Sequence, residues 1–175
     1  MKARAAGAMQ PGARCHSPRS QGTGASEVAL RRACASDAAA IAAIHLAARR
    51  QAMPYLPELH AQDEVRTWVA ASMLPNAVVW VAEMAGELAG YMALKGTELE
   101  HLYVAPRWQG RGIGSALLIR AKELSPGRLQ LYAFQRNARA RAFYEARGFV
   151  AVAFSDGAGN EEKEPDVRYE WTGPA

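Results

Sequence analysis

Cysteine and long apolar runs are what this 175-residue sequence has least of. Its cysteines are Cys15 and Cys34, and no metal-ligand spacing surrounds either of them. This scarcity excludes a disulfide scaffold and predicts no metal site. No apolar run approaches the ~20 residues that cross a membrane, and the N-terminus lacks the hydrophobic stretch of a secretory signal. We therefore expect a cytoplasmic protein with no membrane partner.

Acidic residues are missing from the first 25 positions, although the whole chain carries 17 of them. The segment 1–25 is rich in Gly, Ala, Ser, Arg and Pro, which predicts a disordered basic tail. Outside it 17 basic residues balance 17 acidic ones, so the formal charge of +4 belongs to the tail. The balanced domain over residues 26–175 argues against a nucleic-acid partner. The alternative is a nucleic-acid-associated protein that uses the tail as a basic arm.

The hydrophobic pattern of the domain alternates between strand-like and helix-like periods. It predicts strands at residues 28–33, 77–83, 88–94, 98–104, 129–134, 149–154 and 167–171, and helices at 36–49, 58–72, 112–124 and 137–147. Ser36 is the expected N-cap of the first helix, and Gly148 is expected to end the last one in a left-handed cap. The pattern indicates an α/β fold in which a mixed sheet has helices on both faces.

A glycine-rich turn, Gln109 to Ser115, lies between the predicted strand 98–104 and the next helix. Its glycines let the backbone approach a ligand closely, and the free N–H groups of the helix N-terminus favour an anion there. The dinucleotide pattern G-x-G-x-x-G fails, because Ser115 stands at its last position, and the chain has no Gly-Lys-Ser/Thr tripeptide of a P-loop. The turn therefore predicts a phosphate site of another kind.

Two motifs carry a resemblance to a known family. Leu102-Tyr103-Val104-Ala105-Pro106 is followed by Gln109-x-x-Gly112-x-Gly114, and Asn137 is followed by Tyr144 and then Gly148-Phe149. In this order they resemble the acetyl-CoA motifs of the GCN5-related N-acetyltransferase (GNAT) superfamily, over residues 27–171. The resemblance implies a single-domain, mainly antiparallel mixed sheet with a V-shaped splay at the acetyl-CoA strand. It also implies an N-acetyltransferase that moves the acetyl group from acetyl-CoA to a primary amine by direct transfer in a ternary complex.

The resemblance also implies which residues bind the cosubstrate. The strand residues would pair their backbone with the pantetheine arm, the turn would hold the pyrophosphate through main-chain amides, and Asn137 would bond the pantetheine end. The implied acetyl-CoA residues are Leu102, Tyr103, Val104, Gln109, Gly110, Arg111, Gly112, Ile113, Gly114, Ser115 and Asn137.

Tyr144 is the implied general acid, since a phenol can protonate the departing CoA thiolate. The proton acceptor for the amine is less determined, because the position at which some family members carry a Glu is Tyr132 here. Glu98 and Glu100 are the preferred candidates, ahead of His101. By strict alternation the two glutamates share a face with Leu102, while His101 shares one with Tyr103; a bulge would break that count.

The acceptor is expected to be a small-molecule amine or a peptide amine. An acidic stretch, Asp156 to Asp166, would favour a cationic acceptor if it lined the cleft, although a solvated surface loop is the preferred interpretation. His45 is expected in the core. Arg139, Arg141 and Arg147 are expected on a solvated face, with contact to the 3′-phosphate of CoA as the alternative. A homodimer is suggested by analogy alone. The alternative to an enzyme is a non-catalytic acyl-CoA-binding regulatory module of the same fold.

Overall fold

The computed structural model describes residues 27–173, so the predicted tail 1–25 lies outside the described residues. These residues form a seven-stranded sheet in the order β1-β2-β3-β4-β5-β7-β6. The strands are β1 (Ala29–Arg32), β2 (Val78–Met84), β3 (Glu87–Lys95), β4 (Glu98–Val104), β5 (Arg128–Phe134), β6 (Val150–Ser155) and β7 (Asp166–Thr172). All neighbouring pairs are antiparallel except β4 and β5. The mixed, mainly antiparallel sheet predicted from the sequence is confirmed.

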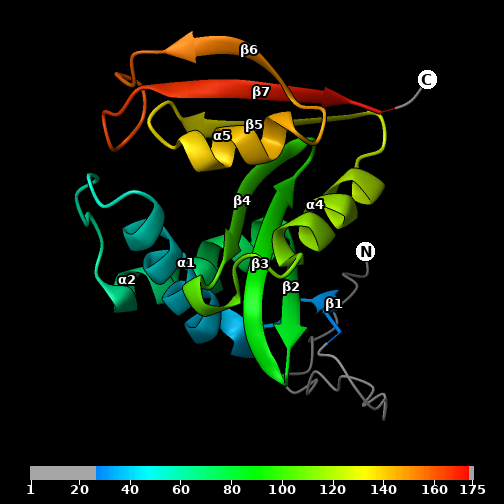
Figure 1. The fold of residues 1–175 in the computed structure, drawn as a ribbon. Helices are drawn as coiled ribbons and strands as arrows, with labels where there is room; N and C mark the ends of the chain where they lie inside the picture. Colours follow the sequence, from blue (N-terminus) through cyan, green and yellow to red (C-terminus); the bar gives the residue numbers. More distant parts are fainter. Residues whose placement is uncertain (1–26, 174–175) are drawn as a thin grey trace, which may run out of the picture.

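The helices cover both faces of this sheet (Figure 1). They are α1 (Ala38–Ala52), α2 (Gln62–Trp68), α3 (Leu74–Asn76), α4 (Ile113–Leu124) and α5 (Ala138–Glu145), with short turns η1 (Ala35–Asp37), η2 (Val69–Met73) and η3 (Pro106–Trp108). Within residues 27–173, no helix is both long enough and apolar enough to span a membrane.

Several helix boundaries differ from the predicted ones. Ser36 is not an N-cap, because a 3-10 turn from Ala35 to Asp37 precedes α1. The helix expected from residue 58 begins only at Gln62, where the Glu64 carboxylate accepts a hydrogen bond from the Ala61 backbone N–H at 2.8 Å. The last helix ends at Glu145, but Gly148 has the predicted left-handed conformation, with φ of 83°.

The sheet opens between β4 and β5. Glu98 and Gln130 are the single residue pair that joins these strands, whereas β4 pairs with β3 along its whole length from Glu98 to Val104. Figure 1 shows β5, β6 and β7 turned strongly away from the direction of β2, β3 and β4. The splay leaves backbone groups of β4 beyond Glu98 unpaired on the side of β5, which is the V-shaped opening that the family resemblance implied.

Two apolar clusters hold the helices on the sheet. One cluster packs Ile113, Leu117 and Leu118 of α4, together with Tyr144 of α5, against strands on both sides of the splay. The other packs α1 and α2 against the opposite face of β2 and β3. The open end of β4 therefore lies between two helical layers whose positions are set by buried side chains.

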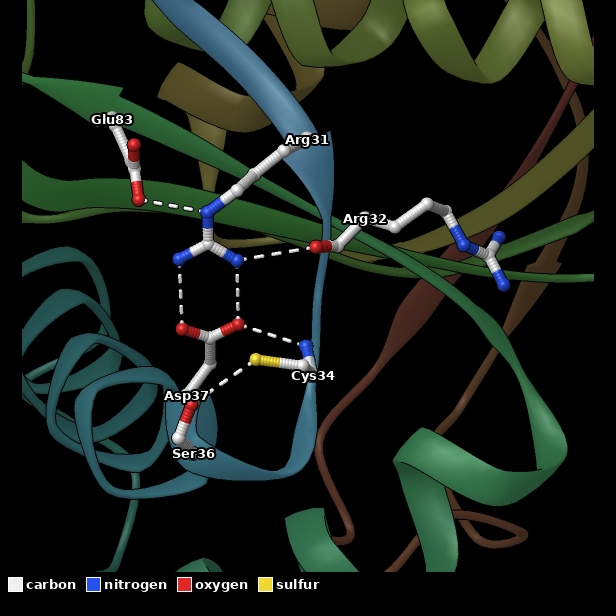
Figure 2. Close-up of polar contacts among 6 residues, drawn as sticks. All are labelled: Arg31, Arg32, Cys34, Ser36, Asp37 and Glu83. Carbon is white, nitrogen blue, oxygen red and sulfur yellow. Dashed lines mark hydrogen bonds and ion pairs between the residues drawn. The ribbon is translucent and has the colours of Figure 1, made fainter. Parts of the chain in front are cut away.

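A polar network fixes the edge strand β1, as Figure 2 shows. The Arg31 guanidinium donates two hydrogen bonds to the Asp37 carboxylate, at 2.7 and 2.9 Å, and one to Glu83 at 2.8 Å. Asp37 also accepts a hydrogen bond from the Cys34 backbone N–H at 2.8 Å. Burial pushes the pKa of Asp37 upward, but the hydrogen bonds from Arg31 and Cys34 outweigh burial and lower that pKa below its usual range. The network ties β1, β2 and the start of α1 together.

Candidate active site

A cavity of about 910 Å³ occupies the opening between β4 and β5. Its walls come mainly from β4, the turn into α4, the end of β5 and α5. The predicted site residues that line it are Glu100, Leu102, Tyr103, Val104, Gln109, Gly110, Gly112, Ile113, Gly114, Ser115, Asn137 and Tyr144. Glu98 and Arg111 do not line it. The fold therefore gathers most of the predicted residues around one cavity.

The glycine turn forms one end of this cavity. Gly110 and Gly112 have φ angles of 77° and 82°, a left-handed conformation that a side chain would strain. Gly112 is the N-cap of α4, and its carbonyl accepts the hydrogen bond of the Ala116 N–H at 3.0 Å. The first amide N–H groups of α4 consequently have no partner within the helix and face the turn, as an anion site requires.

Two arginines, one on α5 and one just after it, contact residues of the glycine turn. The Arg147 guanidinium donates a hydrogen bond to Ser115 Oγ at 2.8 Å and lies 3.8 Å from the ring centre of Phe143. Arg139 donates to Gln109 Oε1 at 2.8 Å. Both arginines line the cavity; Arg139 is exposed, as expected, whereas Arg147 is partly buried. The contacts join residues about 30 positions apart, which no local pattern reveals.

Asn137 and Trp108 differ in how their polar groups are used. Asn137 caps α5, because its Oδ1 accepts a hydrogen bond from the Ala140 N–H at 3.1 Å. The indole N–H of Trp108 is buried at the cavity and has no hydrogen-bond partner among the described residues. An unpaired buried donor at a cavity wall fits a ligand that brings acceptor groups, such as the amides and phosphates of acetyl-CoA.

Tyr144 lies buried in the cavity wall at the end of α5. Its ring packs edge-on against Phe143 and Phe149, with centres 5.2 and 5.6 Å apart. Its hydroxyl makes no hydrogen bond to the described residues. Burial, with a smaller contribution from Tyr103, raises the pKa of the phenol above its usual 10. Tyr144 therefore keeps its proton at neutral pH and presents it to the cavity.

A bulge in β4 changes the expected placement of Glu98 and Glu100, while His101 shares a face with Tyr103 as predicted. Ala93 of β3 pairs with His101, but Leu94 pairs with Leu99, so Glu100 is an extra residue on β4. Strict alternation therefore fails, and Glu98 no longer shares a face with Leu102. Glu100 is exposed at the cavity rim, whereas the ring of His101 lies among the aromatic rings of Trp68, Tyr91 and Tyr103.

A second cavity, of about 490 Å³, lies between α1, α2 and the loop that precedes β7. Two residues, Met53 and His101, line both cavities. The second cavity contains four carboxylates and two guanidinium groups, which are Glu58, Glu64, Glu161, Glu162, Arg49 and Arg50. The excess of carboxylates gives this cavity an acidic character that suits a cationic ligand.

The acidic stretch from Asp156 to Asp166 contributes Glu161 and Glu162 to the wall of this second cavity. The preferred interpretation of this stretch as a solvated surface loop is therefore corrected. Glu162 accepts a hydrogen bond from Arg49 at 2.7 Å, and both side chains are mostly buried. Glu161 lies 2.9 Å from His60 Nε2. These contacts join the loop to α1 and to the segment before α2, more than 100 positions earlier in the chain.

Histidine and aromatic rings fill the junction of the two cavities. His45 is buried, as predicted, with its Nδ1 2.7 Å from the Tyr91 hydroxyl. The ring of His101 lies 5.6 Å from that of His45 and 5.3 Å from that of Trp68. Burial, aided by nearby positive groups, lowers the pKa of His45 to about 3 and that of His101 to about 4. Both imidazoles are therefore neutral at physiological pH.

Comparison with known proteins identifies similar chains. The family model described as an acetyltransferase (GNAT) domain matches residues 75–151. The peptidyl-lysine N-acetyltransferase YiaC of Escherichia coli (strain K12) is 33% identical over 124 residues, which are 70% of this chain and 84% of YiaC.

Two solved structures show the same fold. The solution structure of apo-form YjaB from Escherichia coli has a TM-score of 0.70 at 24% identity, with 85% of this chain and 99% of that chain covered. The structure of yncA from Salmonella typhimurium, determined with its cofactor acetyl-CoA, has a TM-score of 0.65 at 21% identity, with 85% and 95% covered.

Proposed function

Because the chain belongs to the GNAT acetyltransferase family and is an N-acetyltransferase, we propose that it transfers the acetyl group of acetyl-CoA directly to the side-chain amine of a peptidyl lysine. The observation that carries this proposal is the meeting of two cavities at Met53 and His101. The larger cavity has the anion site and the Tyr144 phenol, and the smaller one is acidic. Both substrates can therefore be bound together, as direct transfer in a ternary complex requires.

In this proposal acetyl-CoA occupies the larger cavity. The backbone of Leu102, Tyr103 and Val104 pairs with the pantetheine arm, because these residues have no strand partner on the side of β5. The pyrophosphate lies at the turn 109–115, where α4 amides and Arg147 provide hydrogen-bond donors and positive charge. The structure of yncA with acetyl-CoA supports this choice of cosubstrate.

Tyr144 is the proposed general acid. The amine nitrogen attacks the thioester carbonyl, a main-chain amide near Val104 stabilises the oxyanion, and the C–S bond breaks. Tyr144 then donates its proton to the sulfur, and the apolar wall that raises the phenol pKa also raises that of the departing thiol. No covalent acyl-enzyme is needed, since the cysteine described by the structure, Cys34, does not line either cavity.

The acceptor is proposed to enter through the smaller cavity. An alkylammonium side chain suits walls that combine the apolar surfaces of Val65 and Trp68 with the carboxylates of Glu161 and Glu162. The relative YiaC is named as a peptidyl-lysine N-acetyltransferase, which supports a lysine acceptor over a free small-molecule amine.

The proposal is tested by thiol release from acetyl-CoA with lysine peptides, N-terminal amine peptides, polyamines and aminoglycosides as acceptors. We expect release with lysine peptides, and a roughly 10²-fold or greater fall in kcat for Tyr144→Phe. Acetyl-CoA affinity, measured by calorimetry, should remain within about threefold of the wild type, because the substitution removes one hydroxyl and no phosphate contact. Acetyl-CoA binding without transfer to any acceptor would instead support the non-catalytic regulatory module.

A further inference from the structure

We infer that His101, and neither Glu98 nor Glu100, takes the proton from the acceptor amine during acetyl transfer. This inference rests on the proposed function, because it uses the placement of acetyl-CoA in the larger cavity and of the amine in the smaller one. It concerns a residue that the sequence ranked below both glutamates. Three features of the junction between the cavities support this role for His101.

The first feature is position. Of the residues 27–173, Met53 and His101 alone line both cavities, and His101 is the one of the two that has an ionisable side chain. An amine that reaches from the acidic cavity toward a thioester beside Tyr144 has to pass this junction. A proton acceptor must lie within hydrogen-bond reach of the attacking nitrogen, and His101 meets that requirement where the two substrates join.

The second feature is that the imidazole of His101 has no hydrogen-bond partner among residues 27–173, whereas the His45 imidazole is 2.7 Å from the Tyr91 hydroxyl. The ring of His101 is instead held by aromatic neighbours, with Trp68 edge-on at 5.3 Å and Tyr103 stacked at 6.1 Å. A neutral imidazole in a fixed orientation keeps one nitrogen lone pair available to a ligand.

The third feature is the bulge at Glu100. His101 pairs with Ala93 and Tyr103 pairs with Tyr91, on the face of the sheet covered by α1. The extra residue shifts the part of β4 that precedes it, so that Leu99 pairs with Leu94. Bulges next to active sites re-aim side chains in this way. The same bulge places the Glu100 carboxylate at an exposed rim, and Glu98 lies outside both cavities. Neither glutamate lines the cavity that is proposed for the acceptor.

The proposed step conserves atoms and charge. The neutral amine forms the C–N bond, which makes its nitrogen cationic and far more acidic than a free alkylammonium ion. His101 accepts one proton from that nitrogen, the C–S bond breaks, and Tyr144 gives one proton to the sulfur. The imidazolium then loses its proton to water and the phenolate regains one, so the net transfer is one proton from nitrogen to sulfur.

The experiment compares His101→Ala, His101→Gln and Tyr144→Phe in the full chain, with acetyl-CoA and the best lysine peptide. We expect kcat to fall roughly 10²-fold in both His101 variants, with acetyl-CoA affinity unchanged by calorimetry. Added imidazole should restore part of the rate of His101→Ala, because the vacated site opens to both cavities. Imidazole should not restore the rate of Tyr144→Phe, because that variant has lost the proposed general acid and retains His101.

Four outcomes would overturn the inference. A kcat for His101→Gln within about threefold of the wild type would show that no proton acceptor was lost. Absence of imidazole rescue in a His101→Ala protein that still binds acetyl-CoA would assign His101 a packing role only. A full loss in Glu98→Gln or Glu100→Gln, alongside an active His101 variant, would transfer the role to that carboxylate. A wild-type protein with no acceptor-dependent thiol release would overturn the proposed function itself, and this inference with it.

Discussion

Lowering the pH from 7 to 5 is expected to destabilise the protein by about 4 kcal/mol, because His45 and His101 are held as neutral imidazoles. In the unfolded chain both groups bind a proton near the ordinary histidine pKa of about 6.5. In the folded protein, burial lowers the pKa of His45 to about 3 and that of His101 to about 4, so both imidazoles are still largely unprotonated at pH 5. The unfolded state therefore binds more protons throughout this window, and stability falls as the pH drops.

The magnitude follows from linkage: each histidine contributes roughly 2 kcal/mol between pH 7 and pH 5. Urea unfolding of the wild type at the two pH values measures the sum. His101→Gln, which cannot titrate, should lose about 2 kcal/mol less than the wild type over the same interval. An equal loss in the variant and the wild type would refute the assignment of His101 as a neutral group in the folded protein.

Two further substitutions test other parts of the structure. Asp37→Asn removes the charge that pairs with Arg31 and should lower the free energy of unfolding at pH 7 by roughly 1–3 kcal/mol. The difference should shrink as the pH falls through the lowered pKa of the wild-type carboxyl, and a difference that does not change with pH would contradict the network in Figure 2. Glu162→Gln should raise the KM for a lysine peptide several-fold and leave acetyl-CoA affinity unchanged. The control Glu123→Gln, in an exposed ion pair on α4, should change neither quantity. An unchanged KM in Glu162→Gln would contradict an acidic acceptor site.

Local signals predicted the fold well, and most of the residues that they indicated for the cosubstrate line the larger cavity. The glycine turn 109–115, the cap at Asn137 and the left-handed Gly148 each depend on backbone requirements that a few neighbouring residues express. The mixed sheet followed from the order of strand-like and helix-like periods.

What the sequence did not predict arises from non-local contacts. The bulge at Glu100 depends on the register between β3 and β4, so alternation alone misplaced Glu98 relative to Leu102. The contact between Arg49 and Glu162 joins residues 113 positions apart, so the acidic loop could not be assigned to a cavity from its composition. For the same reason Arg147 was expected on a solvated face, although Ser115 holds it at the anion site.

The single residue pair between β4 and β5 has a consequence for how this enzyme can change. Because the strands barely touch there, the spacing between the two halves of the sheet depends on the apolar cluster that spans them, in which Leu117 and Ala121 of α4 pack among side chains of both halves. A larger or smaller side chain at such a position alters the width of the groove without touching any ligand. Tolerance for bulkier acyl groups is thus open to adjustment from the interior of the protein, while the residues that face the substrates stay the same.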